Sequence, residues 1–491
     1  MMEYEMTGKA EDPKRGMGTD RGSASRVLRK RSLFFCVLFF CICLTPVFLS
    51  FLPGAGKGAA SEAKEAFPKL VGKDGWNVTF LQDAGTYFEK NFGYRDQALT
   101  ANSWIYANLL GTSAVDGVIA GTEGWLYYKD SLDDYIGRNC LSDRSLFNIA
   151  HTEAMVQRDL GLLGIQTVFA IAPNKNTLYG EHMPYYDSLR VAPGKNLHRL
   201  EAYLQQENVN HVDLEQVFKG REEVLYHRLD SHWTNKGAAI AANAILEAAG
   251  KGGPFFAEDN FAPGEAFSGD LERMMYPAYG KTETQTIYGE PFHYAYLGEV
   301  ESNFDPMIET VNPSASGGIV MFRDSFGNAI LPYIAEAYGS AYFSRGVPWQ
   351  INEVYQRGAD TVVMLRAERF LPEIAQNPPA MEALPLFQAP PVGTEAENGA
   401  VLTEVVQEDY LKKISGTISP AYLGEKDRIY VRINGELMYE AFPRSVETDG
   451  IICDNGFTIY LSDLALTQEH NLLEIFAGDE TEITKVYQTE V

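Results

Sequence analysis

Cysteine is scarce in this chain of 491 residues. Five cysteines are present, and three of them, Cys36, Cys41 and Cys43, lie inside one apolar run. Cys140 and Cys453 remain downstream, and neither has a Cys or His nearby at the spacing of metal ligands. The sequence therefore excludes a disulfide framework and a zinc site, predicts no metal and no cofactor, and leaves open whether these last two cysteines pair.

Basic residues are few relative to acidic ones. The chain has 41 Lys and Arg against 66 Asp and Glu, which gives a formal net charge of -25 at pH 7. Because phosphate binding depends on Lys and Arg, this balance excludes a nucleic-acid partner. It also disfavours a strongly anionic polymer unless a local basic groove compensates, so we expect a neutral or weakly charged partner.

Charge is absent from one long stretch, residues 33–53, whose length matches the roughly 20 residues that cross a bilayer core. Arg26, Arg29, Lys30 and Arg31 precede it. The positive-inside rule then predicts a single transmembrane helix, a short cytoplasmic N-terminus and an extracytoplasmic bulk at the cell membrane. The alternatives are a cleaved signal peptide, because small residues follow the run, and a buried core helix.

The length predicts two or more domains, and 45% hydrophobic residues provide enough apolar material for real cores. A helical spacing of apolar residues occupies 81–111. The predicted segments are a cytoplasmic tail (1–32), the anchor (33–53), a linker (54–66), an α/β domain (67–385) and a β-rich domain (400–491).

Short uninterrupted apolar strands alternate with helices in the α/β domain. The strands read QTVFAIAP, NVNHVDL, GGIVMFRD, AYFS and DTVVMLRA. Such alternation predicts a parallel sheet covered by helices on both faces. Residues 251–312 interrupt it with Gly, Pro and aromatic residues, and we expect this insertion to form a lid or part of a substrate cleft. Period-two patterns over 400–491 predict a small antiparallel β-sandwich.

Ser325 is a candidate nucleophile. A serine hydroxyl becomes reactive when a base takes its proton, and the base needs a carboxylate to hold its tautomer. Ser325 stands between the strand GGIVMF and a following helix, at the edge where open α/β sheets place their sites. The helix N-terminus would supply N–H groups for an oxyanion. The alternative is that Asp324 or Ser325 is merely an N-cap.

Asp230 and His232 are the candidate acid and base. In an extended chain, residues i and i+2 point to the same side, so Asp230 can accept from the His232 ring. The alternative is a His packed on core aromatics beside an Asp that caps the next helix. His227 is the nearest rival base, but it has Leu225 where the acid would stand. Because both motifs lie where a strand runs into a helix, we predict that Ser325, His232 and Asp230 converge.

The motifs, in this order, resemble a bacterial family. D-S-H-W-T-N-K-G-A followed by R-D-S-F-G-N is similar to the AlgJ/AlgX-like branch of the SGNH hydrolases and the related DHHW proteins, in which the Asp-His pair precedes the serine. G-T-E-G-W-L-Y-Y, A-P-N-K-N-T-L-Y-G-E-H-M-P and F-S-G-D-L resemble further family stretches, over roughly residues 67–385. Ser231 departs from the second His of the DHHW name, and Arg323 stands where a glycine is usual.

This resemblance implies an SGNH-hydrolase-like three-layer domain that transfers or removes acetyl groups on an extracellular polysaccharide. Ser325 would carry the acetyl ester and His232 would move the proton. Family members work beside a membrane-bound O-acyltransferase, which is therefore a candidate partner. Candidates for contact with substrate or oxyanion are Lys175, Asn174, Arg323 and Asn328. The alternative for the first two is that Lys175 is a solvated loop lysine and Asn174 an ordinary turn asparagine.

The β-rich domain stands where the alginate protein of this family carries a carbohydrate-binding module. Its candidate sugar platforms, which the pattern equally allows as core residues, are Tyr422, Tyr430, Tyr439 and Phe442.

Two classes of function fit the sequence. The first is a polysaccharide O-acetyltransferase or the related acetylesterase, which differ only in whether a sugar hydroxyl or water accepts the acetyl group. The second is a non-catalytic, membrane-anchored scaffold or polysaccharide-binding protein with an SGNH-like fold. The presence of Asp230, His232 and Ser325 together favours the enzyme, because a scaffold needs none of them.

Overall fold

The computed structural model describes residues 21–49, 67–72, 75–91, 93–191, 194–252, 255–396, 398–448, 450–468 and 470–491. The described residues form two compact units. The first consists of the described residues of Met1–Trp104 together with Tyr276–Tyr279. The second consists of those of Ile105–Met275 and Gly280–Val491. Most of the predicted tail and the whole predicted linker fall on residues 1–20 and 50–66, which lie outside the described residues.

Helices of the first unit break where the sequence pattern continues. They are α1 (Arg21–Leu49), α2 (Phe80–Asn91) and α3 (Arg95–Ile105). The stretch predicted as helical over 81–111 is interrupted before α3 at Tyr94, whose φ of 64° lies in the left-handed region. A left-handed residue cannot continue a right-handed helix. The apolar spacing is therefore divided between shorter helices.

The transmembrane helix predicted over 33–53 is not confirmed. None of the helices in the described part of the chain has both the length and the hydropathy needed to cross a bilayer. The helix that contains the apolar run, α1, begins within the polar leader and ends at Leu49, and residues 50–53 lie outside the described residues.

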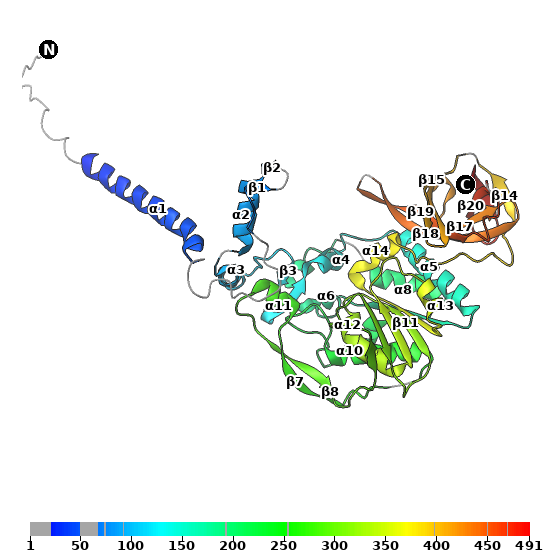
Figure 1. Cartoon of the computed structure of the whole chain (residues 1–491), viewed down its shortest axis with the longest axis horizontal. Helices are drawn as coiled ribbons and strands as arrows, with labels where there is room; N and C mark the ends of the chain where they lie inside the picture. Colours follow the sequence, from blue (N-terminus) through cyan, green and yellow to red (C-terminus); the bar gives the residue numbers. More distant parts are fainter. Residues whose placement is uncertain are drawn as a thin grey trace, which may run out of the picture. The chain divides into compact units, whose positions relative to one another are not determined.

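The second unit contains a seven-stranded sheet (Figure 1). In spatial order its strands are β6 (His211–Val212), β5 (Gln166–Ala172), β13 (Thr361–Ala367), β11 (Gly318–Phe322), β12 (Ser340–Ser344), β10 (Met307–Val311) and β9 (Ala295–Leu297). The first five are parallel and coincide with the five predicted strands. The predicted α/β fold with a parallel sheet is therefore confirmed.

Helices cover both faces of this sheet, and alternate strand residues supply the two cores. Val168, Met321 and Val363 lie beside one another in the register and pack on one face. Phe169 and Phe322, which follow two of them along the chain, pack on the other. This alternation follows from the period of two in a strand, and burial of each such side chain contributes about 1.5–3 kcal/mol.

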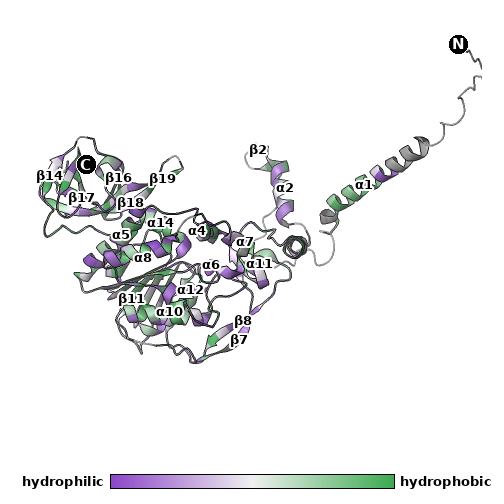
Figure 2. Cartoon of the chain, turned by 180° about the vertical axis from the view of Figure 1, so that it is seen from behind, coloured by the Kyte–Doolittle hydropathy of each residue, from purple (hydrophilic) through white to green (hydrophobic). Residues whose placement is uncertain are grey.

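The first face is covered by α9 (Leu214–Phe218), α10 (Asn235–Ala248) and α12 (Gly327–Ala337). The opposite face is covered by α5 (Asp143–Gly161), α8 (Asn196–Gln206), α13 (Asn352–Gln356) and α14 (Leu371–Gln376). Figure 2 shows α10 rich in hydrophobic residues, whereas α8 carries hydrophilic and hydrophobic residues, as expected of an amphipathic outer helix. The three-layer arrangement predicted from the sequence is present.

The insertion 251–312 is more regular than its composition predicts. It contains the antiparallel pair β7 (Phe261–Phe267) and β8 (Glu283–Tyr288) and the short helix α11 (Asp270–Met275). Its last part supplies β9 and β10, which extend the main sheet in the antiparallel sense. Gly and Pro disfavour strands, but pairing of β7 with β8 and of β10 with β12 overrides that local preference. The expected lid or part of a substrate cleft stays a prediction.

The C-terminal region forms an eight-stranded β domain. In spatial order its strands are β14 (Val392–Glu395), β21 (Ile483–Glu490), β20 (Leu472–Gly478), β17 (Arg428–Ile433), β18 (Leu437–Thr448), β19 (Ile451–Ser462), β16 (Leu411–Ile418) and β15 (Ala400–Glu408). Every neighbouring pair is antiparallel except β14 with β21. The first half of β18 pairs with β17 and the second half with β19, so one long strand joins the two halves around a common core.

Three of the four candidate sugar platforms in this domain are core residues. Tyr430, Tyr439 and Phe442 are buried, whereas Tyr422 is 40% exposed and lines an open depression of about 500 Å³. Cys140 and Cys453 are both free thiols.

Candidate active site

Ser325 lies in the turn between β11 and α12. The Asp324 carboxylate fixes this turn, because Oδ1 accepts from the Phe326 N–H at 2.9 Å and Oδ2 from the Ala367 N–H at 2.8 Å, at the end of β13. The N-cap residue of α12 is Phe326, and no side chain caps the helix. The N-cap alternative therefore fails, and the partly exposed Ser325 hydroxyl is left for another partner.

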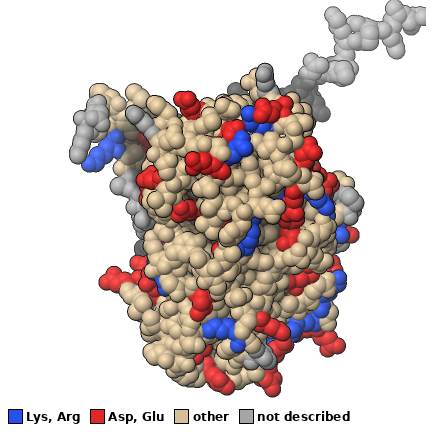
Figure 3. Space-filling view, turned by 90° about the vertical axis from the view of Figure 1, so that its right-hand side faces the viewer, with Lys and Arg blue, Asp and Glu red and all other residues tan. Residues whose placement is uncertain are grey.

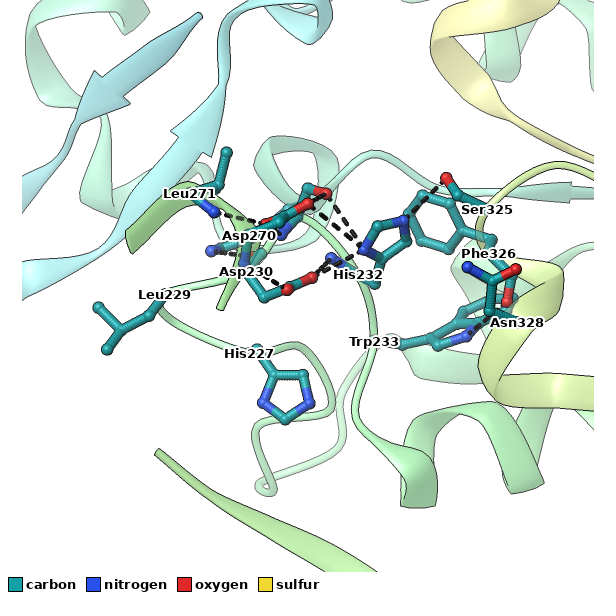
Figure 4. A network of polar contacts seen from close by, with 12 residues as sticks. His227, Leu229, Asp230, His232, Trp233, Asp270, Leu271, Ser325, Phe326 and Asn328 are labelled. Atoms are coloured by element: carbon teal, nitrogen blue, oxygen red, sulfur yellow. Dashed lines mark hydrogen bonds and ion pairs between the residues drawn. The ribbon is translucent and has the colours of Figure 1, made fainter. Parts of the chain in front are cut away.

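That partner is His232. Its Nε2 lies 2.8 Å from Ser325 Oγ, and its Nδ1 lies 2.7 Å from Asp230 Oδ1 (Figure 4). The predicted convergence of the three residues is therefore present. The helix-cap alternative for Asp230 also fails, because Thr234 caps α10 through the Gly237 N–H.

The segment that carries this pair is not the exit of a sheet strand, as the sequence led us to expect. It belongs to the connection between α9 and α10, and Asp230 Oδ1 also accepts from the His232 backbone N–H at 3.0 Å. Asp230 therefore holds His232 through an Asx-type turn instead of an extended chain. The Trp233 indole N–H donates to the Phe326 carbonyl at 3.1 Å, which ties this loop to the nucleophile turn.

The Asp230 carboxylate stays ionised despite its burial. Burial alone would raise the pKa of Asp230, but the hydrogen bond and the charge of His232 hold it well below the usual range. Its second oxygen accepts from the Asp270 backbone N–H at 2.7 Å. An ionised, oriented acid is what the neighbouring imidazole needs to take up a proton.

Asp270, from the F-S-G-D-L stretch, lies at the candidate site, and the sequence analysis did not single it out. Its carboxylate accepts from the Ser231 hydroxyl at 2.6 Å and from the Ser231 N–H at 2.9 Å, and Oδ2 lies 3.7 Å from His232 Nδ1. Asp230, His232 and Asp270 together could in principle hold a metal ion. The short contact between the imidazole and Asp230 instead fits a proton-transfer pair. The resemblance of the G-D-L turn to the family was the available signal for Asp270.

His227, the rival base, faces elsewhere. Its ring is buried against Phe267 with the centroids 4.7 Å apart, and Nε2 lies 3.1 Å from the Gln285 amide nitrogen. Burial lowers the pKa of His227. Figure 4 shows it on the side of Asp230 away from Ser325, so it cannot serve as the base.

Lys175 and Asn174 lie behind the site. The buried Lys175 ammonium donates to the carbonyls of Leu126, Arg228 and Asp230, and the two latter bonds measure 2.8 Å. All three of its protons are used, so none remains for substrate. Asn174 is also buried and donates its side-chain amide to Asp134 at 3.2 Å. The strand-exit loop turns inward, which the sequence pattern did not reveal.

Arg323 is likewise internal, whereas Asn328 lies at the site. The buried Arg323 guanidinium donates to Asn328 Oδ1 at 2.6 Å, and burial lowers the pKa of Arg323 to about 10. Arg345 donates to the same oxygen at 3.4 Å, which leaves the Asn328 amide nitrogen as a donor. Figure 4 shows that nitrogen on the side of His232 and Ser325. Asn328 and the Ser325 N–H are therefore suited to an oxyanion hole.

The charged groups around the nucleophile are of both signs. Arg345 and Arg369 form no ion pair with a carboxylate in the described part of the protein, and the Arg369 guanidinium carbon lies 5.5 Å from the Phe326 ring centroid. On the face drawn in Figure 3, basic groups occur only in small, separate groups among acidic ones. These two guanidinium groups near Phe326 and Asn328 stand against the carboxylates of Asp230, Asp270 and Asp324 around the same turn.

An α/β domain with a Ser-His-Asp arrangement at the carboxyl edge of its sheet is typical of SGNH-like serine hydrolases. Residues 118–286 match the family described as "SGNH hydrolase-like domain, acetyltransferase AlgX". The probable alginate O-acetylase AlgJ of Pseudomonas putida (strain KT2440) is 29% identical over 246 residues, which cover 46% of this chain and 59% of that protein. These similarities support the AlgJ/AlgX-like SGNH hydrolase-type family that the motifs predicted, over part of the chain.

Two solved structures are similar at lower identity. The O-acetyltransferase domain of Pseudomonas putida AlgJ shares 19% identity, with 52% of this chain and 92% of that one covered and a TM-score of 0.34. A DHHW family protein from Eubacterium siraeum DSM 15702 shares 16% identity, with 46% and 85% covered and a TM-score of 0.37. The family match includes Asp230, His232 and Asp270 but ends before Ser325, whose role rests on geometry.

Proposed function

We propose that this protein is an extracytoplasmic serine O-acetyltransferase that modifies a polysaccharide through an acetyl ester on Ser325. The observation that carries the proposal is the continuous set of hydrogen bonds from Asp230 through His232 to the Ser325 hydroxyl. The name of the AlgJ relative, a probable alginate O-acetylase, supports acetyl transfer as the chemistry.

In the first half of the reaction, Ser325 Oγ attacks the acetyl carbonyl of a donor while His232 Nε2 takes the hydroxyl proton. The Asp230 carboxylate stabilises the resulting imidazolium. The Ser325 N–H and the Asn328 amide donate to the oxyanion. His232 then returns the proton to the leaving group, and the acetyl ester on Ser325 remains.

In the second half, a sugar hydroxyl gives its proton to His232 and attacks the ester carbonyl. The bond between the acetyl carbon and Ser325 Oγ breaks, and His232 returns the proton to Ser325. Water in place of the sugar would make the protein an acetylesterase. Transfer is favoured by the AlgJ relative's name and requires that the acceptor sugar be held near the ester.

The proposal includes an extracytoplasmic location for the catalytic domain and a membrane-bound source of its acetyl groups. The four basic residues before the apolar run of 33–53 favour export of the catalytic domain. An extracytoplasmic acetyltransferase needs acetyl groups delivered across the membrane, so the family resemblance supports a membrane-bound O-acyltransferase as partner.

The test is acetylation of the purified full-length chain by p-nitrophenyl acetate. Intact-protein mass spectrometry is read together with release of nitrophenol, for the wild type, Ser325→Ala and the exposed control Ser188→Ala. We expect an acetyl-sized adduct in the wild type and in the control, and a loss of turnover of about 10⁴-fold in Ser325→Ala. An adduct that persists in Ser325→Ala, or a folded wild type as inert as that variant, would reject the proposal and favour the scaffold function.

A further inference from the structure

A short loop between β9 and β10 is held in place by Arg323 and Arg345, which also bond to Asn328 in the first turn of α12. Arg323 Nη2 donates to the carbonyls of Asn303 at 3.1 Å and Asp305 at 2.9 Å. Arg345 Nη1 donates to the carbonyl between them, that of Phe304, at 3.3 Å. Two guanidinium groups thus bind three consecutive carbonyls, which fixes the backbone of this loop.

The same two arginines connect the loop to the first turn of α12. Both donate to Asn328 Oδ1, and the Asn303 side-chain amide donates to the Asn328 carbonyl at 3.2 Å. Asn328 in turn donates its backbone N–H to the Ser325 carbonyl at 3.1 Å. The loop is therefore two hydrogen bonds from the nucleophile, and its position relative to Ser325 is fixed.

This arrangement presents an aromatic ring to solvent. Phe304 is 65% exposed although its backbone is anchored, and the partly exposed Tyr296 donates its hydroxyl to Asn303 Oδ1 at 2.6 Å. A scattered exposed Phe would need no explanation. Here, however, the loop that carries Phe304 is held by the Arg323 guanidinium, whose burial costs free energy.

We propose that Phe304 is the platform on which a pyranose ring of the acceptor stacks during transfer of the acetyl group from Ser325. The C–H groups on one side of a pyranose form an apolar, weakly positive face, which packs on the negative face of an aromatic ring. Tyr296 adds a polar rim beside it. The inference rests on the proposed function and specifies its acceptor as a sugar ring instead of a small alcohol.

Phe304 changes how much of the acetyl group on Ser325 goes to a sugar and how much goes to water. When a stacked sugar gives its hydroxyl proton to His232 and attacks, the ester bond to Ser325 breaks and a sugar acetate forms. When water attacks instead, acetate forms. Because a held acceptor reacts as if highly concentrated, Phe304 raises the ratio of transfer to hydrolysis.

The experiment measures that ratio with p-nitrophenyl acetate as donor and either cello-oligosaccharides, chito-oligosaccharides or glycerol as acceptor. Full-length wild type is compared with Phe304→Ala, Phe304→Trp and Phe387→Ala, the last a 95% exposed phenylalanine in the segment before β14. For Phe304→Ala we expect the ratio with an oligosaccharide to fall about 5- to 10-fold, as for loss of one aromatic contact, with a smaller change for glycerol. Phe304→Trp should keep the wild-type ratio, and Phe387→Ala should leave it unchanged.

Equal effects of Phe304→Ala on glycerol and oligosaccharides, or none on either, would overturn the inference and leave the acetyl-serine mechanism standing. A wild type that acquires the acetyl adduct but transfers it to no sugar would do the same. Absence of any adduct on Ser325, read first by mass spectrometry, would instead reject the proposed function.

Discussion

Two histidines of this protein each bond to carboxylates, in two different regions. At the carboxyl edge of the sheet, His232 bonds to Asp230 through Nδ1 and to a serine through Nε2. Where α5 packs on β18, His151 lies 2.8 Å from Glu207 through Nδ1 and 2.8 Å from Glu440 through Nε2. A carboxylate beside an imidazole therefore does not by itself identify a catalytic site.

What differs is the second ring nitrogen and its access to solvent. The His232 side chain is 21% exposed and its Nε2 meets a hydroxyl, whereas the His151 side chain is 4% exposed and both nitrogens meet carboxylates. Burial alone would lower the pKa of His151, but hydrogen bonds to Glu207 and Glu440 raise it overall. A proton on His151 is thus held in place, whereas one on His232 can be exchanged with substrate.

The largest expected effect is the loss of activity when His232 is replaced. His232→Gln should lower kcat/KM for p-nitrophenyl acetate by about 10⁴-fold, because no other group can take the serine proton. The midpoint of thermal unfolding should change little, since the ring is partly exposed. Steady-state kinetics and a thermal melt check both points, and retention of a tenth of the activity would contradict the assignment.

The same substitution at His151 should lower stability and leave activity unchanged. His151→Gln removes the cation shared by the buried Glu440 and the partly exposed Glu207, while Arg158 still pairs with Glu440 at 2.6 Å. We therefore expect the free energy of unfolding to fall by about 1.5–3 kcal/mol, as for loss of hydrogen bonds to charged groups. Activity per folded molecule should stay unchanged. Denaturant unfolding is the measurement, with Glu480→Gln as a control for an exposed carboxylate that pairs with Arg428.

The stability difference of His151→Gln should also depend on pH. Because the folded pKa of His151 is raised, its contribution is fully present below the unfolded value of about 6.5 and is lost as pH rises through the folded value. The gap between wild type and variant should therefore narrow at alkaline pH. A gap that widens instead would mean that His151 is buried in its neutral form.

A smaller effect is expected from Asp270, whose carboxylate bonds to Ser231 between Asp230 and His232. Asp270→Asn keeps the N–H that donates to Asp230 but weakens the bonds from Ser231. We expect kcat to fall about 10- to 100-fold, because misplacement of the base by about an ångström costs that much. Asp270→Glu should restore part of the rate, and identical pH–rate profiles with full activity in Asp270→Asn would show that the side chain is dispensable.

The last prediction concerns Lys175, behind the site, and involves stability alone. Burial lowers the pKa of Lys175 to about 7, so between pH 7 and the unfolded value of about 10.4 the unfolded chain binds more protons than the folded protein. The free energy of unfolding should therefore rise with pH in this window, by at most about 1.4 kcal/mol per unit. Lys175→Met should flatten that rise, and the exposed Lys219→Met should not, as measured by urea unfolding at several pH values.

The nucleophile and its base could be predicted because their signals are local. A serine between a buried strand and a helix, and an Asp two residues before a His, are recognisable from neighbouring residues alone. The Asp270 backbone N–H donates to Asp230 from another part of the chain. Because nearly every residue type has such an N–H, the sequence does not indicate this bond. Lys175 looked available for substrate because a loop lysine is usually solvated, yet three inward carbonyls bind it.

The sequence by itself determined the five parallel strands, the helices between them, the period-two strands of the C-terminal domain and the identity of the Ser-His-Asp residues. Each depends on hydrophobic periodicity or turn chemistry over a few residues, where local free energies are decisive. Only the tertiary structure decided that β9 and β10 join the sheet, that Asp270 supports the acid and that two arginines tie the loop of Phe304 to Asn328, three residues after Ser325. Those contacts join residues far apart in the chain, and packing of the whole domain sets their free energy.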